Sequence, residues 1–437
     1  MWSLITILIS LILLVVLAMR GFTIIVIAPA VSLVVMLLNQ MPILETFQDV
    51  YMSGFINYVK NYFLIFLFAA MFGKFMDDSG AARTIAQYLL RVLGKKSKLR
   101  VLISIMVVCA FLTYGGVSLF VVVFAILPIA KPIFKEMDIP WHLFIAAFFT
   151  GIATFTMTML PGTPAIQNII PITYLGTTVT AGAWIGLTAT VAVIAFNIWY
   201  MKYALKKSEQ RNETYASMKN LEQSDDPSLT ADKYANKKLP NLFVSLTPPL
   251  LLLLLLNVFK VEVLYTLMIT VVITSLVFWR YIDAKKKTLN IGATNAVLPI
   301  INTSADVGYG AVIAATAGFT VFQDMIADIP GNPLVSLYVA TTLLAGITGS
   351  SSGGLGIAME TLTDTYLKLG VNPEAFHRVA SIASGGLDAL PHNGAVITTL
   401  VVTGLTHKDA YKHVFVTAVL APIIAAIPAL LVAITFY

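Results

Sequence analysis

Long apolar runs dominate the chain and are separated by short polar segments. A helix that spans a bilayer needs about 20 largely apolar residues. The first half has such runs at 2–19, 22–38, 61–76, 141–160 and 178–201. The second half has them at 241–258, 263–280, 303–321, 375–405 (with a break) and 411–434. The pattern predicts an all-α polytopic membrane protein with five spans in each half.

Two further apolar stretches, 101–134 and 334–367, are interrupted by small residues. The first interruption is 114–118 (Tyr-Gly-Gly-Val-Ser) and the second is 349–354 (Gly-Ser-Ser-Ser-Gly-Gly). Each stretch fits either two spans or one re-entrant hairpin, because bare backbone at membrane depth needs protein or a water-filled cavity around it.

The positions of the basic residues favour the hairpins. With both stretches as hairpins and the polar linker inside, roughly 24 of the 28 Lys and Arg lie on the cytoplasmic side. Lys60, Lys260, Lys368 and Arg378 are the four that fall outside. This distribution predicts a protein of the cell membrane with both termini outside.

Composition excludes other classes. Of the 437 residues, 58% are hydrophobic and 11% are charged, whereas soluble domains have about 25% charged residues. The net charge of +6 therefore concerns topology and indicates no nucleic-acid partner. The single cysteine, Cys109, excludes a disulfide scaffold.

The order of apolar runs and interruptions is the same in both halves, which predicts two repeats. The first covers 1–201, with a hairpin at about 100–135 and a broken helix at about 141–175. A cytoplasmic linker follows at 202–240. The second repeat covers 241–437, with a hairpin at about 334–370 and a broken helix at about 375–405. Because five spans is an odd number, the second copy is inverted, and inverted repeats with broken helices are typical of secondary transporters.

The four interruptions carry hydroxyl and amide side chains beside exposed backbone N–H groups. Helix N-termini and such groups bind anions, so we expect a site for a small carboxylate. The candidates are Gly115, Gly116, Ser118, Thr163, Gln167, Asn168, Ser350, Ser351, Ser352, Gly353, Asn393 and Thr398. The alternative is that these small residues only allow close helix packing.

Ionisable residues inside spans are costly and usually functional. Asp388, His392 and Glu360 are the candidates for proton coupling. Asp306 and Asp364 are also ionisable candidates of the predicted membrane segments, and the alternative for Asp306 is that it begins a helix near the cytoplasmic face. A sodium site made of backbone carbonyls at the breaks is the alternative to proton coupling.

One string has the pattern of an enzyme. Residues 349–353 fit the G-x-S-x-G nucleophile elbow, with His392 as a base for Ser351. That pattern expects a strand-to-helix turn, so an intramembrane serine hydrolase is the weaker alternative, and we expect no enzyme. The spacing of His142, His377, His407 and His413 indicates no metal site, and no cofactor is expected.

Three strings in the second half closely resemble the gluconate permease (GntP) family. They are 377–380 (His-Arg-Val-Ala), 384–395 (Ser-Gly-Gly-Leu-Asp-Ala-Leu-Pro-His-Asn-Gly-Ala) and 403–407 (Thr-Gly-Leu-Thr-His). The segment 115–120 is similar to the first-half hairpin of that family. The resemblance implies a proton-coupled importer of sugar acids and small hydroxy acids. It also implies a homodimer with a scaffold and a moving transport domain, an elevator.

The first broken segment departs from the gluconate branch. That branch has a histidine- and proline-rich segment here, whereas this chain has Leu160-Pro161-Gly162-Thr163-Pro164. The departure favours a smaller acid, such as 3-hydroxybutyrate, over gluconate. The sequence thus predicts import of a small hydroxy-monocarboxylate or sugar acid by proton symport.

Overall fold

The computed structural model describes residues 2–20, 22–93, 97–117, 119–215, 237–321, 331–391 and 393–437. Every regular element in these ranges is a helix, which confirms the predicted all-α fold. Four helical stretches in the described chain are long and apolar enough to cross a membrane: Ile43–Asp78, Ala183–Gln210, Lys285–Ala314 and His407–Phe436. Shorter apolar helices accompany them. The protein is therefore an integral membrane protein.

The first half is a succession of helices of very different length. A π-helical turn, η1 (Thr46–Tyr51), joins α3 to α4. The helices are α1 (Trp2–Met19), α2 (Ile24–Leu38), α3 (Ile43–Glu45), α4 (Met52–Asp78), α5 (Ala81–Leu93), α6 (Lys98–Tyr114), α7 (Leu119–Glu136), α8 (Leu143–Ile152), α9 (Phe155–Thr158), α10 (Ile166–Leu175) and α11 (Ala183–Gln210).

The second half begins after the linker. A second π-helical turn, η2 (Phe415–Leu420), lies within its last long helical stretch. The helices are α13 (Leu242–Asn257), α14 (Val263–Val277), α15 (Lys285–Ala314), α17 (Pro333–Thr348), α18 (Ser351–Lys368), α19 (Pro373–Ser384), α20 (Gly394–Thr403), α21 (His407–Val414) and α22 (Ala421–Phe436).

Side-chain caps fix where the helices of the second half begin. Asn241, Asn332 and Asn372 accept hydrogen bonds from the first backbone N–H groups of α13, α17 and α19. Pro333 and Pro373 follow two of these caps, where the missing N–H of proline costs nothing. These starts are therefore specified locally by the sequence.

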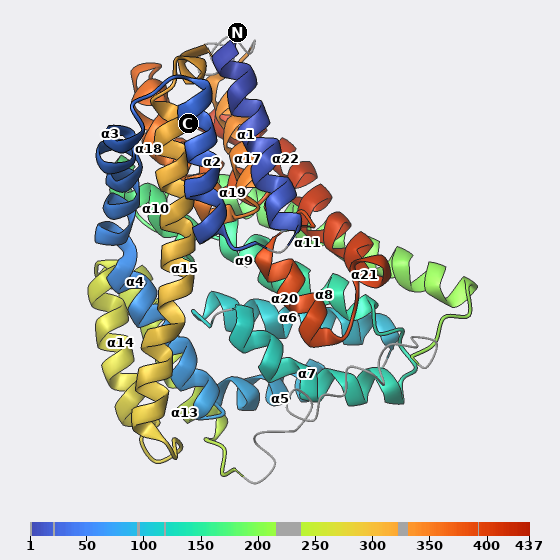
Figure 1. The fold of residues 1–437 in the computed structure, drawn as a ribbon. Helices are drawn as coiled ribbons and strands as arrows, with labels where there is room; N and C mark the ends of the chain where they lie inside the picture. The colour runs from blue at the N-terminus through green and yellow to red at the C-terminus, as the bar shows by residue number, and fades with distance from the viewer. Residues whose placement is uncertain are drawn as a thin grey trace.

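The long helices α4 and α15 run side by side along one edge of the molecule (Figure 1). Small residues allow their close approach: a Cβ built on Gly54 would lie 2.9 Å from Cβ of Ala311. A Cβ on Gly308 would lie 2.9 Å from the carbonyl oxygen of Tyr51. Close contact through small residues is how helices associate where lipid removes the hydrophobic driving force.

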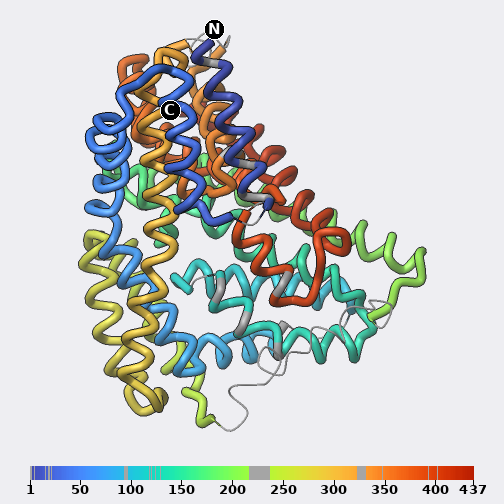
Figure 2. The backbone as a smooth tube through the Cα atoms, viewed as in Figure 1, coloured from blue at the N-terminus to red at the C-terminus, as the bar shows by residue number. Residues whose placement is uncertain are grey.

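Helices α17 and α18 pack against each other as a hairpin. The turn between them begins at Gly349, which ends α17 with φ +60°, a left-handed conformation that favours glycine. A Cβ on Gly354 would lie 2.3 Å from the backbone of Ala345, so the two arms touch backbone to backbone. The backbone trace shows this hairpin near both chain ends, which lie at the same end of the molecule (Figure 2).

Candidate functional site

The tip of the α17–α18 hairpin presents hydroxyl groups at the N-terminus of α18. The Oγ of Ser350 accepts a hydrogen bond from the backbone N–H of Gly353 at 3.1 Å and caps the helix. The Oγ of Ser352 lies 3.4 Å from that of Ser350 and 3.5 Å from the Oγ1 of Thr303 on α15. The tip therefore faces α15.

Asn393 joins this tip to the break between α19 and α20. Its Nδ2 donates to the carbonyl of Gly349 at 2.8 Å, although the two residues are 44 positions apart. Its Oδ1 accepts from the backbone N–H of Val396 at 2.9 Å and so caps the start of α20. The structure thus brings together four predicted site residues: Ser350, Ser352, Gly353 and Asn393.

Ser351 points away from this group. Its Oγ lies 2.9 Å from the Oγ of Ser384 on α19. Ser381, one turn earlier on α19, donates to the carbonyl of Gln167 on α10 at 2.9 Å. Ser351 therefore helps to pack α18 on α19, and α19 in turn contacts the first break.

Polar side chains at the first break, the interruption between α8 and α10, hold its backbone in place. The Nδ2 of Asn168 donates to the carbonyls of Thr163 and Val179 at 2.9 and 2.8 Å. Its Oδ1 lies 3.1 Å from the Nε2 of His377. The Oγ1 of Thr163 accepts from the N–H of Ala165 at 3.3 Å. The Oε1 of Gln167 is the exception, because it is buried without a hydrogen-bond partner among the described residues.

The charge count assigns Arg378 to the outer side of the membrane, and the structure shows what its side chain contacts. Its side chain is fully buried in α19. It donates to the carbonyls of Ala181 at 2.9 Å, Val179 at 3.1 Å and Met159 at 3.5 Å. A guanidinium has five donors and no acceptor, so Arg378 serves several carbonyls around the first break. Single-residue charge counting misses this role because it ignores which neighbours surround the residue.

The remaining predicted positions lie around these two breaks. Gly115 and Gly116 pack against α13, where a Cβ on Gly116 would lie 3.3 Å from Leu252. Thr398 is half-buried on α20. Glu360 is exposed and accepts a hydrogen bond from the hydroxyl of Tyr174 at 2.7 Å. Ser118 and His392 lie outside the described residues.

Two carboxylates beside the second break have an oxygen without a partner. The Oδ1 of Asp388, between α19 and α20, is buried and has no hydrogen-bond partner among the described residues. The same holds for the Oδ1 of Asp306. The alternative that Asp306 begins a helix is wrong: it lies towards the C-terminal end of α15 and is 2% exposed. Its position within a long apolar helix is what made it a candidate in the sequence.

A partnered polar cluster joins the start of α8 and the end of α21 to α11. The Nδ1 of His142 lies 2.7 Å from the Nε2 of His413, whose Nδ1 lies 2.9 Å from the hydroxyl of Tyr200. The Nε2 of His142 lies 3.0 Å from Glu213. Burial alone would raise the pKa of Glu213, but hydrogen bonds from Ser208 and His142 keep it below its usual value.

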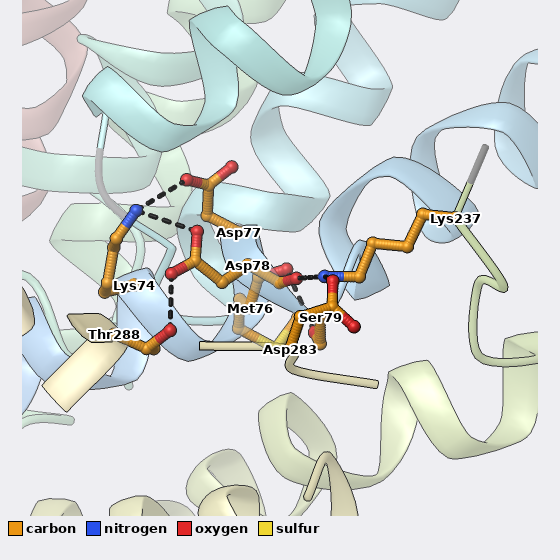
Figure 3. A network of polar contacts seen from close by, with 8 residues as sticks. All are labelled: Lys74, Met76, Asp77, Asp78, Ser79, Lys237, Asp283 and Thr288. Carbon is orange, nitrogen blue, oxygen red and sulfur yellow. Dashed lines mark hydrogen bonds and ion pairs between the residues drawn. The ribbon is translucent and has the colours of Figure 1, made fainter. Parts of the chain in front are cut away.

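A second partnered network ties the end of α4 to α15 and the end of the linker (Figure 3). The Nζ of Lys74 lies 2.8 Å from Asp78 and 3.6 Å from Asp77. The Oγ1 of Thr288 donates to Asp78 at 2.7 Å, and Lys237 donates to the carbonyl of Asp78. These carboxylates differ from Asp306 and Asp388 in having cations beside them.

With this geometry described, comparison with known proteins identifies the class. Residues 2–435 match the family model of the GntP family permeases. The chain belongs to the GntP permease family. The resemblance found in the sequence strings of the second half is confirmed.

Another comparison agrees with this assignment. The chain is 38% identical over 451 residues to a Bacillus subtilis (strain 168) protein named "Uncharacterized transporter YxjC". The match covers 94% of this GntP permease and 95% of that protein. Both findings point to a transporter and not to an enzyme.

Proposed function

We propose that this permease is a secondary active transporter that imports a small hydroxy-monocarboxylate or sugar acid by proton symport. Family membership supports transport of gluconate-like acids. The observation that carries the proposal is the second break, where Asn393 bonds the tip of the α17–α18 hairpin. There, hydroxyl groups and the N-terminus of α18 accompany two carboxyl groups that each have one buried oxygen without a hydrogen-bond partner among the described residues. Such a helix end suits a substrate carboxylate, and the carboxylates suit a coupled proton.

The substrate-binding residues of this proposal are those predicted from the sequence. Around the second break they are Ser350, Ser351, Ser352, Gly353, Asn393 and Thr398. Around the first break they are Gly115, Gly116, Ser118, Thr163, Gln167 and Asn168. Asp388, His392 and Glu360 are proposed to couple the proton. The first break contributes less to ligand contacts in this proposal, because the amide of Asn168 and the hydroxyl of Thr163 are bonded to the backbone.

We further propose that the two halves are inverted repeats of an elevator-type carrier. The order of elements supports this: each half has a pair of helices, a long helix, a second pair, an interrupted helix and a last long stretch. The long helices α4 and α15, which hold the same place in the two halves, pack together. The distribution of Lys and Arg supports a cell-membrane protein with both termini outside. A homodimer is proposed from the family resemblance.

Uptake into proteoliposomes tests the proposal. Labelled gluconate, 3-hydroxybutyrate, lactate and D-serine are supplied with an inward proton gradient, an inward sodium gradient or neither. We expect one acid to accumulate only with the proton gradient. Accumulation driven by sodium alone would replace the proton by a sodium site at the helix breaks. No transport of any acid would overturn the proposal.

The hydrolase alternative is tested by Ser351→Ala. A serine hydrolase would lose all turnover, whereas the carrier loses one hydrogen bond to Ser384, worth about 0.5–1.5 kcal/mol. We expect uptake to persist with an altered affinity.

A further inference from the structure

Asp306 is directed at the N-terminus of α18, where the proposed substrate carboxylate would bind. A Cβ built on Gly353, the third residue of α18, would lie 2.7 Å from the Oδ2 of Asp306. Glycine is thus needed here for the carboxyl group to approach the backbone. The first turn of a helix leaves N–H groups free and carries a partial positive charge, so this position favours a negative charge.

The surroundings of Asp306 offer no other neutralising group among the described residues. Three tyrosines are close enough to interact electrostatically with it: Tyr51 of η1, Tyr58 of α4 and Tyr309 of α15. The hydroxyl of Tyr58 has no hydrogen-bond partner within the ranges that the structure describes, and that of Tyr309 pairs with Ser10 at 2.8 Å. From α18 the neutral Gly353 faces Asp306, and Ser352 contacts Thr303 one turn earlier on α15. The buried face of α2 against α15 has no titratable residue.

We propose that Asp306 is a further proton-coupling residue, whose carboxylate competes with the substrate carboxylate for the N-terminus of α18. This inference rests on the proposed function and specifies how its proton is coupled. In the empty carrier the ionised Asp306 is stabilised by the helix N-terminus. A substrate anion takes that place only when Asp306 has gained a proton.

The coupling follows from the cost of placing two negative charges at one buried site. Two carboxylates that share a site cannot both be ionised without a large penalty, so binding of one favours protonation of the other. A proton from the outer solution forms the O–H bond of Asp306 as the substrate binds. When the substrate leaves on the inner side, that proton leaves to water and the carboxylate returns to the helix end. One proton then accompanies one monoanion, and the step is electroneutral.

The chain also explains why this carboxylate, and not the acidic residues at the end of α4, would carry the proton. Asp78 has Lys74 at 2.8 Å, so its charge is compensated permanently. The compensation for Asp306 comes from a helix end that a ligand can occupy instead. Only the second arrangement makes the charge of the carboxylate depend on the substrate.

Asp306→Asn, studied in proteoliposomes with the acid that the wild-type protein transports, tests the proposal. Between about pH 6 and 8 we expect the wild-type affinity for the substrate to fall with pH, approaching about tenfold per pH unit because one proton is linked. In Asp306→Asn the affinity is expected to be independent of pH. Accumulation driven by a proton gradient is lost in this variant, while exchange of external for internal substrate continues.

A matched control is Asp364→Asn. It removes an exposed carboxylate on α18, the helix whose N-terminus Asp306 approaches, and the variant should behave as wild type. Retained proton-driven accumulation in Asp306→Asn, with a wild-type pH dependence, would overturn the inference while leaving the proposed function intact. Failure of the wild-type protein to transport any acid overturns the proposed function instead.

A second variant covers the case in which Asp306→Asn does not fold. Asp306→Glu keeps the carboxyl group but moves it by one methylene relative to the helix end. It should remain coupled, with the midpoint of the pH dependence of affinity displaced. An undisplaced midpoint would also overturn the inference, because it means that the linked proton lies elsewhere.

Discussion

At the first break, between α8 and α10, the amide of Asn168 donates to the backbone carbonyls of Thr163 and Val179. The guanidinium of Arg378 on α19 donates to those of Val179 and Ala181 in the adjacent loop before α11. Between α19 and α20, in contrast, Asp388 has a buried oxygen with no partner in the described part of the chain, and Asp306 contributes another beside the adjoining hairpin tip. Both breaks belong to interrupted helices at the same place in their halves. Their polar groups are nevertheless used differently.

The difference separates structural from functional polarity. Hydrogen-bonded groups at the first break stabilise an irregular backbone that would otherwise be unsatisfied in a membrane. A buried carboxylate oxygen without a partner is costly unless a proton neutralises the group or a helix N-terminus compensates its charge. A group whose burial costs free energy and does not stabilise the fold is expected to serve binding or coupling. The second half therefore holds most of the proposed chemistry.

The largest expected effect is a loss of stability at the first break. Arg378→Met removes the donor for the carbonyl of Ala181 and weakens the bonding of Val179 and Met159. We expect the free energy of unfolding to fall by about 2–4 kcal/mol, since buried groups without partners cost about 1–3 kcal/mol each. Thermal unfolding in detergent measures the change. Arg378→Lys keeps the charge but not the planar fork, so its stability should lie between those of the wild type and Arg378→Met. If Arg378→Met unfolds at the wild-type temperature, Arg378 has no structural role.

The second effect concerns function without stability. Asp388→Asn removes the charge of a buried carboxylate but keeps its shape, so the protein should unfold at the wild-type temperature or above it. We expect accumulation driven by a proton gradient to fall about tenfold or more, the range of a typical coupling energy. Unchanged proton-driven uptake would show that Asp388 does not couple the proton.

A smaller effect is expected where the hairpin tip meets the second break. Asn393→Ala removes the bond to Gly349 and the cap of α20, together worth about 1–2 kcal/mol. Substrate affinity should fall, because the tip is no longer held against the break.

The matched control for this prediction is Asn332→Ala at the other end of the hairpin. Asn332 caps α17 through the N–H of Leu334 at 2.9 Å, so its removal should lower stability and leave affinity unchanged. Equal affinities for the two variants would mean that the contact between Asn393 and Gly349 is only structural.

The smallest expected effect concerns Glu213, which lies outside both breaks. Because the pKa of Glu213 is below its usual value in the folded protein, ionised Glu213 stabilises the fold, and this contribution is lost as the pH falls below about 4.5. Glu213→Gln should be slightly less stable than wild type at neutral pH and equal to it in acid, measured by thermal unfolding against pH. A pH effect on affinity between about pH 6 and 8 then cannot come from Glu213, because the carboxylate stays ionised there.

Much of the fold could be predicted from the chain. The apolar runs predict helices and membrane insertion, and cap residues such as Asn332 and Asn372 mark where helices begin. Gly349 with the serines after it predicts the interruption between α17 and α18. These features depend on neighbours within a few residues, which is the range over which side-chain caps and glycine act.

The tertiary structure decided the roles of individual polar residues. Adjacent Ser351 and Ser352 face α19 and α15 respectively, and Arg378 is buried among carbonyls from around the first break. Asp306 lies against Gly353, 47 positions along the chain. Helix periodicity predicts which residues share a face, but it does not predict which other helix covers that face. Whether a buried polar group forms a hydrogen bond depends on the helix that covers it, and only long-range packing brings that helix into place.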